Sequence, residues 1–153
     1  MTVPQEAIFQ EDSTFHHYLE YEVATTAADA AIVTALAGAL SATGTEIRVV
    51  VAFGAELWRR LMPGEVPEGL ASFAGLAGVA AAELPASQRD LLFWVHGARL
   101  DVVLDGALAI DRALAGVARL ALDERGFTYH DSRDLTGFID GTANPKGAAA
   151  PSS

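Results

Sequence analysis

One short stretch near the end of the sequence constrains the fold and the function more than any other: Gly137-Phe138-Ile139-Asp140-Gly141-Thr142-Ala143-Asn144-Pro145. Asp140 is its only ionisable residue. The glycines on either side allow tight backbone angles, and Asn144-Pro145 interrupts any regular element. Because apolar neighbours disfavour the charged form of a carboxylate, we expect a raised pKa for Asp140, in a range that suits proton transfer.

A simple turn residue is the alternative interpretation of Asp140, since an aspartate between glycines often only hydrogen-bonds its own backbone. Two upstream segments bear on this choice. Residues 50–61 read as a strand followed by a short helix, and residues 89–97 as a further strand. With the final stretch they resemble, in sequence and in order, the first domain of the dye-decolourising (DyP-type) haem peroxidases, whose signature is GxxDG. The resemblance covers essentially the whole chain, but only the N-terminal half of a typical member.

The resemblance implies a cofactor, a reaction and a set of site residues. The cofactor is haem b, and the substrates are hydrogen peroxide and small reductants such as dyes or phenols. Asp140 matches the distal aspartate that moves a proton between the peroxide oxygens, and we predict it as the catalytic residue. The residues expected to contact haem are Ile139, Asp140, Gly141, Thr142 and Asn144. Many relatives have an acidic residue where this chain has Ala143.

The axial histidine and the distal arginine of the family lie downstream of the signature, in a second ferredoxin-like half. No metal ligand is therefore predicted in this chain, and the missing C-terminal half or another copy is the expected partner. We also expect a homo-oligomer. The alternative is a non-catalytic ferredoxin-like interaction module, or an inactive fragment without the haem-ligating half. An enzyme similar to chlorite dismutases ranks lower, because that group lacks the GxxDG loop.

Hydrophobic periodicity gives the same fold class. Alternation over residues 14–23 predicts a strand with one buried side, on which His17 lies, and one polar side. A helix, a strand at 46–53, a short helix at 55–61 and a strand at 91–96 follow. A long helix capped by Asp101 and a fourth strand at 126–131 complete the pattern, with Asp123-Glu124-Arg125 in a turn between them. We expect one turn of helix within 74–82. The class is α+β, a ferredoxin-like (split βαβ) antiparallel sheet with helices on one face.

Composition narrows the class of protein further. The chain has 153 residues, of which 51% are hydrophobic and 20% charged, enough for one domain with a sizeable core. A net charge of −10 without a Lys/Arg cluster argues against nucleic acid or an anionic membrane as a partner. The absence of cysteine excludes thiolate chemistry. With no signal-like start and no long apolar run, we predict a cytoplasmic protein.

The domain is expected to span residues 1–145, followed by a disordered tail at 146–153.

Histidines offer little further chemistry. His16 and His17 are neighbours in a strand and must face opposite sides, so they cannot hold one ion together. Trp58 and Trp94 are oxidisable, but core packing is the better interpretation of both.

Overall fold

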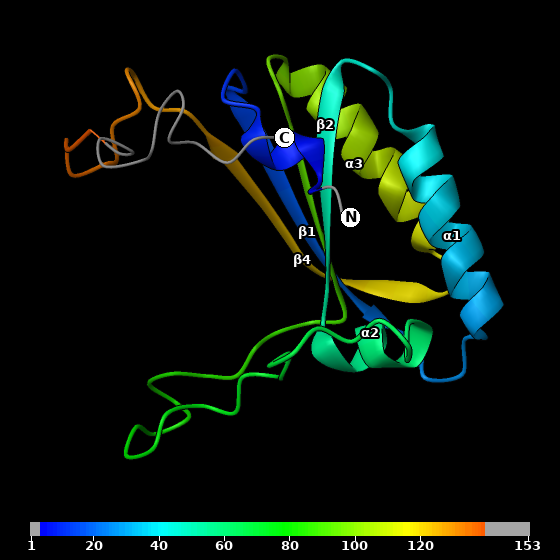
Figure 1. The fold of residues 1–153 in the computed structure, drawn as a ribbon. Helices are drawn as coiled ribbons and strands as arrows, with labels where there is room; N and C mark the ends of the chain where they lie inside the picture. Colours follow the sequence, from blue (N-terminus) through cyan, green and yellow to red (C-terminus); the bar gives the residue numbers. More distant parts are fainter. Residues whose placement is uncertain (1–3, 140–153) are drawn as a thin grey trace.

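The computed structural model describes residues 4–139, and Asp140 to the C-terminus lies outside that range. A short 3-10 helix, η1 (Glu6–Phe9), precedes the sheet and its helices. In chain order these are β1 (Phe15–Val23), α1 (Asp29–Ala42), β2 (Ile47–Phe53), α2 (Ala55–Leu61), β3 (Leu91–Gly97), α3 (Leu100–Leu114) and β4 (Ala118–Phe127). Figure 1 shows α1 and α3 side by side on one face of the sheet and α2 at one of its ends.

The strands form one antiparallel sheet in the order β2-β3-β1-β4. β1 and β3 are central, with Leu19 opposite Phe93, and Phe93 is in turn opposite Val51 of β2. Strands β1 and β2, which are joined through α1, therefore run in the same direction with β3 between them. This is the predicted split-βαβ arrangement of the ferredoxin-like α+β class, confirmed in the described part of the chain.

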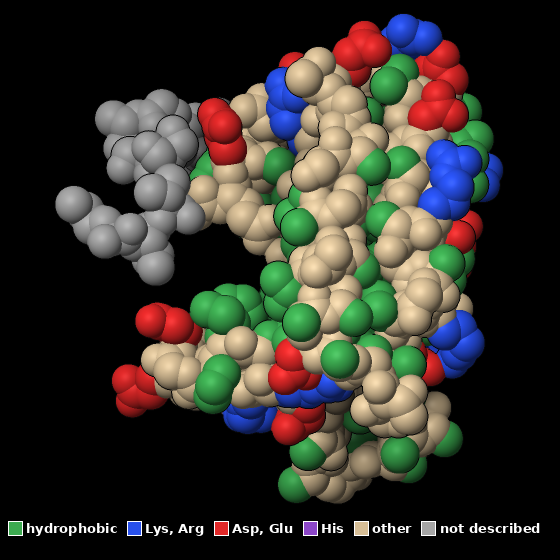
Figure 2. Space-filling model, turned by 90° about the vertical axis from the view of Figure 1, so that its right-hand side faces the viewer, with side chains coloured by type: hydrophobic (Ala, Val, Ile, Leu, Met, Phe, Trp, Pro, Cys, Tyr) green, Lys and Arg blue, Asp and Glu red, His purple; other side chains and the backbone are tan. Residues whose placement is uncertain are grey.

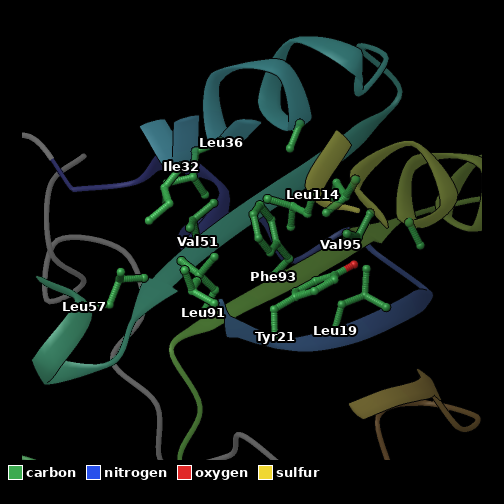
Figure 3. Close-up of a cluster of buried hydrophobic side chains, with 14 of the residues drawn as sticks. Leu19, Tyr21, Ile32, Leu36, Val51, Leu57, Leu91, Phe93, Val95 and Leu114 are labelled. Atoms are coloured by element: carbon green, nitrogen blue, oxygen red, sulfur yellow. The ribbon is translucent and has the colours of Figure 1, made fainter. Parts of the chain in front are cut away.

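The core lies between the sheet and the helix pair α1–α3 (Figure 3). Alternate residues of β1 and β3 point towards it, and Tyr21 meets Phe93 edge-on, with ring centroids 5.9 Å apart at 87°. Gly106 of α3 permits the close approach of this helix to β2. A Cβ at that position would lie 2.3 Å from Cδ1 of Ile47, well inside van der Waals contact.

The predicted position of the fourth strand is wrong. β4 occupies Ala118–Phe127, so Asp123, Glu124 and Arg125 lie within the strand instead of in a turn. β4 is an edge strand that pairs only with β1 in the described sheet, and an edge tolerates charged side chains. Asp123 even has a partner on the core side, because its Oδ1 lies 2.6 Å from Nε2 of His17.

Residues 62–90, between α2 and β3, contain no helix or strand. The expected helical turn within 74–82 is wrong, and hydrogen-bonded turns such as that from Leu76 O to Val79 N (3.1 Å) stand in its place. Side chains of α2 hold the first part of this loop: Trp58 Nε1 donates to Glu65 O (2.9 Å), and Arg59 donates to Leu70 O. The loop extends away from the sheet (Figure 1).

Acidic and basic side chains are interspersed over the side of the molecule shown in Figure 2, which is the side of the helix pair. No described helix combines the length and the apolar character needed to cross a bilayer. The described residues also contain no group of three or more histidine, aspartate or glutamate side chains that could hold a metal ion.

Candidate functional site

The predicted site begins at the edge of the described structure. Ile139 lies within it, whereas Asp140, Gly141, Thr142 and Asn144 lie outside the described residues. What the structure does show is the segment that leads to Asp140, residues 128–139 directly after β4 (Figure 1, orange). This segment, residues 128–139, is called the approach.

The approach folds back on itself twice. The amide of Thr128 donates to Thr14 O (2.8 Å), which joins the segment to the start of β1. Isolated antiparallel bridges then pair Tyr129 with Arg133 and Arg133 with Ile139. Arg133 takes part in both bridges. Its main chain therefore connects the segment just after β4 with Ile139, the residue that precedes Asp140.

Backbone hydrogen bonds close the second return. Asp134 N donates to Phe138 O (2.9 Å), and Gly137 N donates to Asp134 O (3.0 Å). Gly137 has φ of 94°, a left-handed conformation that favours glycine, so the first position of the signature is set by this turn. The Asp134 carboxylate accepts from the hydroxyl and the amide of Thr136, and these hydrogen bonds lower the pKa of Asp134.

The guanidinium of Arg133 spans the turn. Nε and Nη2 donate to the two carboxylate oxygens of Asp131 at 2.7 and 3.0 Å, and Nη1 donates to the carbonyl oxygen of Gly137 at 2.9 Å. The contact with Gly137 was missed because a main-chain carbonyl leaves no signal in a sequence.

The turn carries large apolar side chains into solvent. Leu135 is 85% exposed, Phe138 76% and Ile139 44%. Just before it, His130 and Ser132 adopt positive φ angles of 47° and 66°, which are uncommon for residues with a side chain. Contiguous apolar exposure is a feature of interaction sites and of aggregation-prone surfaces.

A cluster of stacked rings lies on the second face of the sheet, which is the face opposite the helices. Four rings from the two central strands stack there: His16, Tyr18, Trp94 and His96. Trp94 lies at the centre, with its ring centroid 4.4 Å from that of His96, and its Nε1 donates to Nδ1 of His16 (3.1 Å). Trp94 therefore packs outside the helix-covered core.

His96 is fully buried, although it belongs to this second face. Its Nδ1 lies 2.7 Å from Oγ of Ser13, while Nε2 has no partner that meets hydrogen-bond geometry. The Ala7 carbonyl nevertheless lies near enough to favour protonation. Burial outweighs this effect and, with the neighbouring His16, lowers the pKa of His96.

Three of the four described histidines lie in the sheet, and the fourth, His130, is exposed within the segment that leads to the signature. His17 is buried and bound to Asp123, His96 is enclosed, and His16 accepts the Trp94 hydrogen bond at Nδ1. A surface groove of about 520 Å³ lies between η1, β2 and α1, but its lining contains no histidine.

Comparisons with known proteins place this α+β domain in a family. The family model described as Dyp-type peroxidase, N-terminal, matches residues 5–128. A dye-decolorizing peroxidase of Mycolicibacterium paratuberculosis is 39% identical over 107 residues, which are 70% of this chain and 30% of that protein. One from Rhodococcus erythropolis is 38% identical over 104 residues, 68% of this chain and 30% of its own length.

Solved structures agree with the sequence comparisons. A putative dyp-type peroxidase from Shewanella oneidensis superposes with a TM-score of 0.81 at 29% identity, covering 96% of this chain and 50% of that one. A heme complex of a DypB variant from Rhodococcus jostii gives 0.77 at 29% identity, covering 95% and 50%. The chain belongs to the Dyp-type peroxidase family, and it spans about half the length of these solved relatives.

Proposed function

We propose that this chain supplies the distal-side domain of a haem-dependent peroxidase, which reduces hydrogen peroxide and oxidises dyes, phenols or other small reductants. One observation carries the proposal. This chain belongs to the family, and its GxxDG aspartate directly follows Ile139. The main chain of Ile139 is paired with that of Arg133 in a closed turn.

Haem b is the cofactor that family membership implies, and the residues present fit one side of it. The exposed side chains of Phe138 and Ile139 provide apolar surface for a porphyrin, with Gly141, Thr142 and Asn144 as further contacts. Bound haem supplies the redox chemistry. The axial histidine would come from the downstream half or from another chain.

Asp140 carries the proton. Its carboxylate would take a proton from one peroxide oxygen and return it to the other, which would leave as water when the O–O bond breaks with two electrons from bound haem. A group placed for such a transfer contributes roughly 100- to 10,000-fold to the rate.

The test of this role is Asp140→Asn in a chain extended to the length of its relatives. The two side chains are nearly isosteric, so haem content and fold should be retained. The reaction with peroxide should slow by roughly 100-fold or more, and its pH dependence should change.

Asp105→Asn, an exposed change on α3, is the matched control and should react at the parent rate. A parent rate across the pH range for Asp140→Asn itself would reduce Asp140 to a turn residue.

A non-catalytic interaction module is the second candidate, and a specific observation favours it. Three of the four stacked rings on the second sheet face, His16, Tyr18 and Trp94, are only partly buried. Titration with haem of the chain extended to the length of its relatives separates the two. A stoichiometric haem complex that bleaches dye with peroxide supports the peroxidase, and an extended chain that neither holds haem nor bleaches dye supports the interaction module. The cytoplasmic location and the homo-oligomer stay predictions under both candidates.

A further inference from the structure

We infer that Arg133 is a positioning residue for Asp140, an inference that rests on the proposed role of that aspartate. The guanidinium of Arg133 fixes the turn that ends at Ile139, and through it the direction in which the chain enters the signature. Arg133 does not act on the substrate. It acts through the main chain that carries the proton-transferring carboxylate.

The contacts of Arg133 lie on both sides of the turn. Asp131 precedes the turn and receives two donors, and Gly137 lies beyond the tip and receives a third at 2.9 Å. The planar guanidinium presents its donors in a fixed fork, so one side chain holds the two ends at a set separation. A lysine has one ammonium and cannot reproduce this geometry.

The backbone on either side of Arg133 continues the same restraint. Its amide donates to Tyr129 O (3.0 Å), and an isolated bridge pairs it with Ile139 on the other side of the turn. Asp140 is the next residue after Ile139. Because a misplacement of about 1 Å at a reacting group can cost 100-fold in rate, small changes in this turn are expected to reach the chemistry.

A plain surface ion pair is the competing interpretation. The side chains of Arg133 and Asp131 are 39% and 59% exposed, and such pairs contribute little to stability. The chain contains a matched pair for comparison. Arg99 donates to both carboxylate oxygens of Asp101, also two residues away, and it lies 4.0 Å from Glu46. No hydrogen bond from Arg99 to a carbonyl across a turn is found in the described structure.

The experiment measures local order in the 153-residue chain. Backbone ¹⁵N order parameters are compared for the parent, Arg133→Gln and Arg99→Gln, with melting temperature as the measure of global stability. In the parent, the amides of residues 134–138 should be rigid, with order parameters of about 0.85. Arg133→Gln should lower them to below about 0.6, whereas Arg99→Gln should leave them unchanged, and both should melt close to the parent.

Two further variants separate the contacts of Arg133. Asp131→Asn weakens the ion pair and keeps the donor to Gly137, so most of the order should survive. Arg133→Lys keeps the charge and loses the fork, so order should fall between the parent and Arg133→Gln. Equal order parameters in the parent and Arg133→Gln would overturn the inference. If Arg133→Gln does not fold, these two variants decide it by the same criterion.

A double-variant cycle in the extended haem-bearing chain tests whether Arg133 acts through Asp140. Arg133→Gln alone should slow the peroxide reaction by roughly 10- to 100-fold. Combined with Asp140→Asn, it should add nothing further, since its target is already removed. Full additivity would overturn the positioning role. A parent rate for Asp140→Asn would instead refute the proposed function, while the order parameters would still report on the turn.

Discussion

The two faces of the sheet are built from the same strands and differ completely in character. Towards the helices, Tyr21 and Phe93 pack edge to face in a dry core, and both are fully buried. Towards the other side, Tyr18 and Trp94 stack nearly parallel, with centroids 6.1 Å apart at 15°, and remain partly exposed. The alternation of a strand thus distributes neighbouring residues between a dry core and a more open face lined by stacked rings.

The comparison is sharpest within β3, where Phe93 and Trp94 are adjacent. Phe93→Ala should lower the free energy of unfolding by about 3–5 kcal/mol, because it leaves a large cavity in the core. Trp94→Ala removes a larger ring from a half-open surface and should cost only about 1–2 kcal/mol. Denaturant unfolding of both variants checks this, and equal losses would show that the second face is also a core.

His96 offers the next largest effect, through pH. The unfolded chain holds this histidine at its ordinary pKa of 6.5, and burial lowers the pKa in the folded state. Between the two values the unfolded state binds more protons, so stability should fall as the pH drops below about 6.5. The slope for one proton is at most about 1.4 kcal/mol per pH unit.

Unfolding measured from pH 7.5 to 5 checks this prediction, and His96→Phe should flatten the profile. The groups that face His96 are His16, Arg48 and Asp12. The lowered pKa of His16 acts in the same direction, so a residual slope is expected. The exposed His130→Gln is the control and should leave the profile unchanged. A profile that His96→Phe does not alter would place the titrating group elsewhere.

The smallest effect compares the two tyrosine hydroxyls of β1. Tyr21 donates to Asp111 across 3.4 Å, and burial together with this carboxylate raises the pKa of Tyr21. Tyr21→Phe should therefore cost about 0.5–1.5 kcal/mol, the usual net value of a hydrogen bond. Tyr18→Phe should stay within about 0.5 kcal/mol of the parent. Thermal unfolding of the pair measures the difference, and a larger loss for Tyr18→Phe would contradict it.

The sequence predicts most of the sheet, and its failures have physical causes. The alternation in β1 places His17 and Tyr18 on opposite faces, as found. Alternation does not predict the bounds of β4. The pairing register between β4 and β1 shifts between Glu20 and Tyr21, and this shift interrupts the period of two. α3 begins one residue before the expected cap, Asp101, with Arg99 in the capping position and no side-chain cap bond.

The candidate site, like the sheet, could be predicted from the sequence only in part. The GxxDG stretch can be recognised in the sequence, because its glycines meet a backbone requirement and its aspartate meets a chemical one. The positive φ of Gly137 agrees with that reading within the described residues. The contact between Arg133 and Gly137 is visible only in three dimensions, since any residue supplies a carbonyl. The role of Asp140 itself stays a prediction.

The position of β1 in the sheet has a consequence for how the chain folds. β1 is the first strand, yet both of its neighbours come late in the sequence: Tyr21 pairs with Leu91 on one side, and Phe15 pairs with Phe127 on the other. Closing such long loops precedes any gain from the contacts, which slows folding. During synthesis, β1 must therefore wait with both edges unpaired until β3 emerges from the ribosome, and with one edge unpaired until β4 follows.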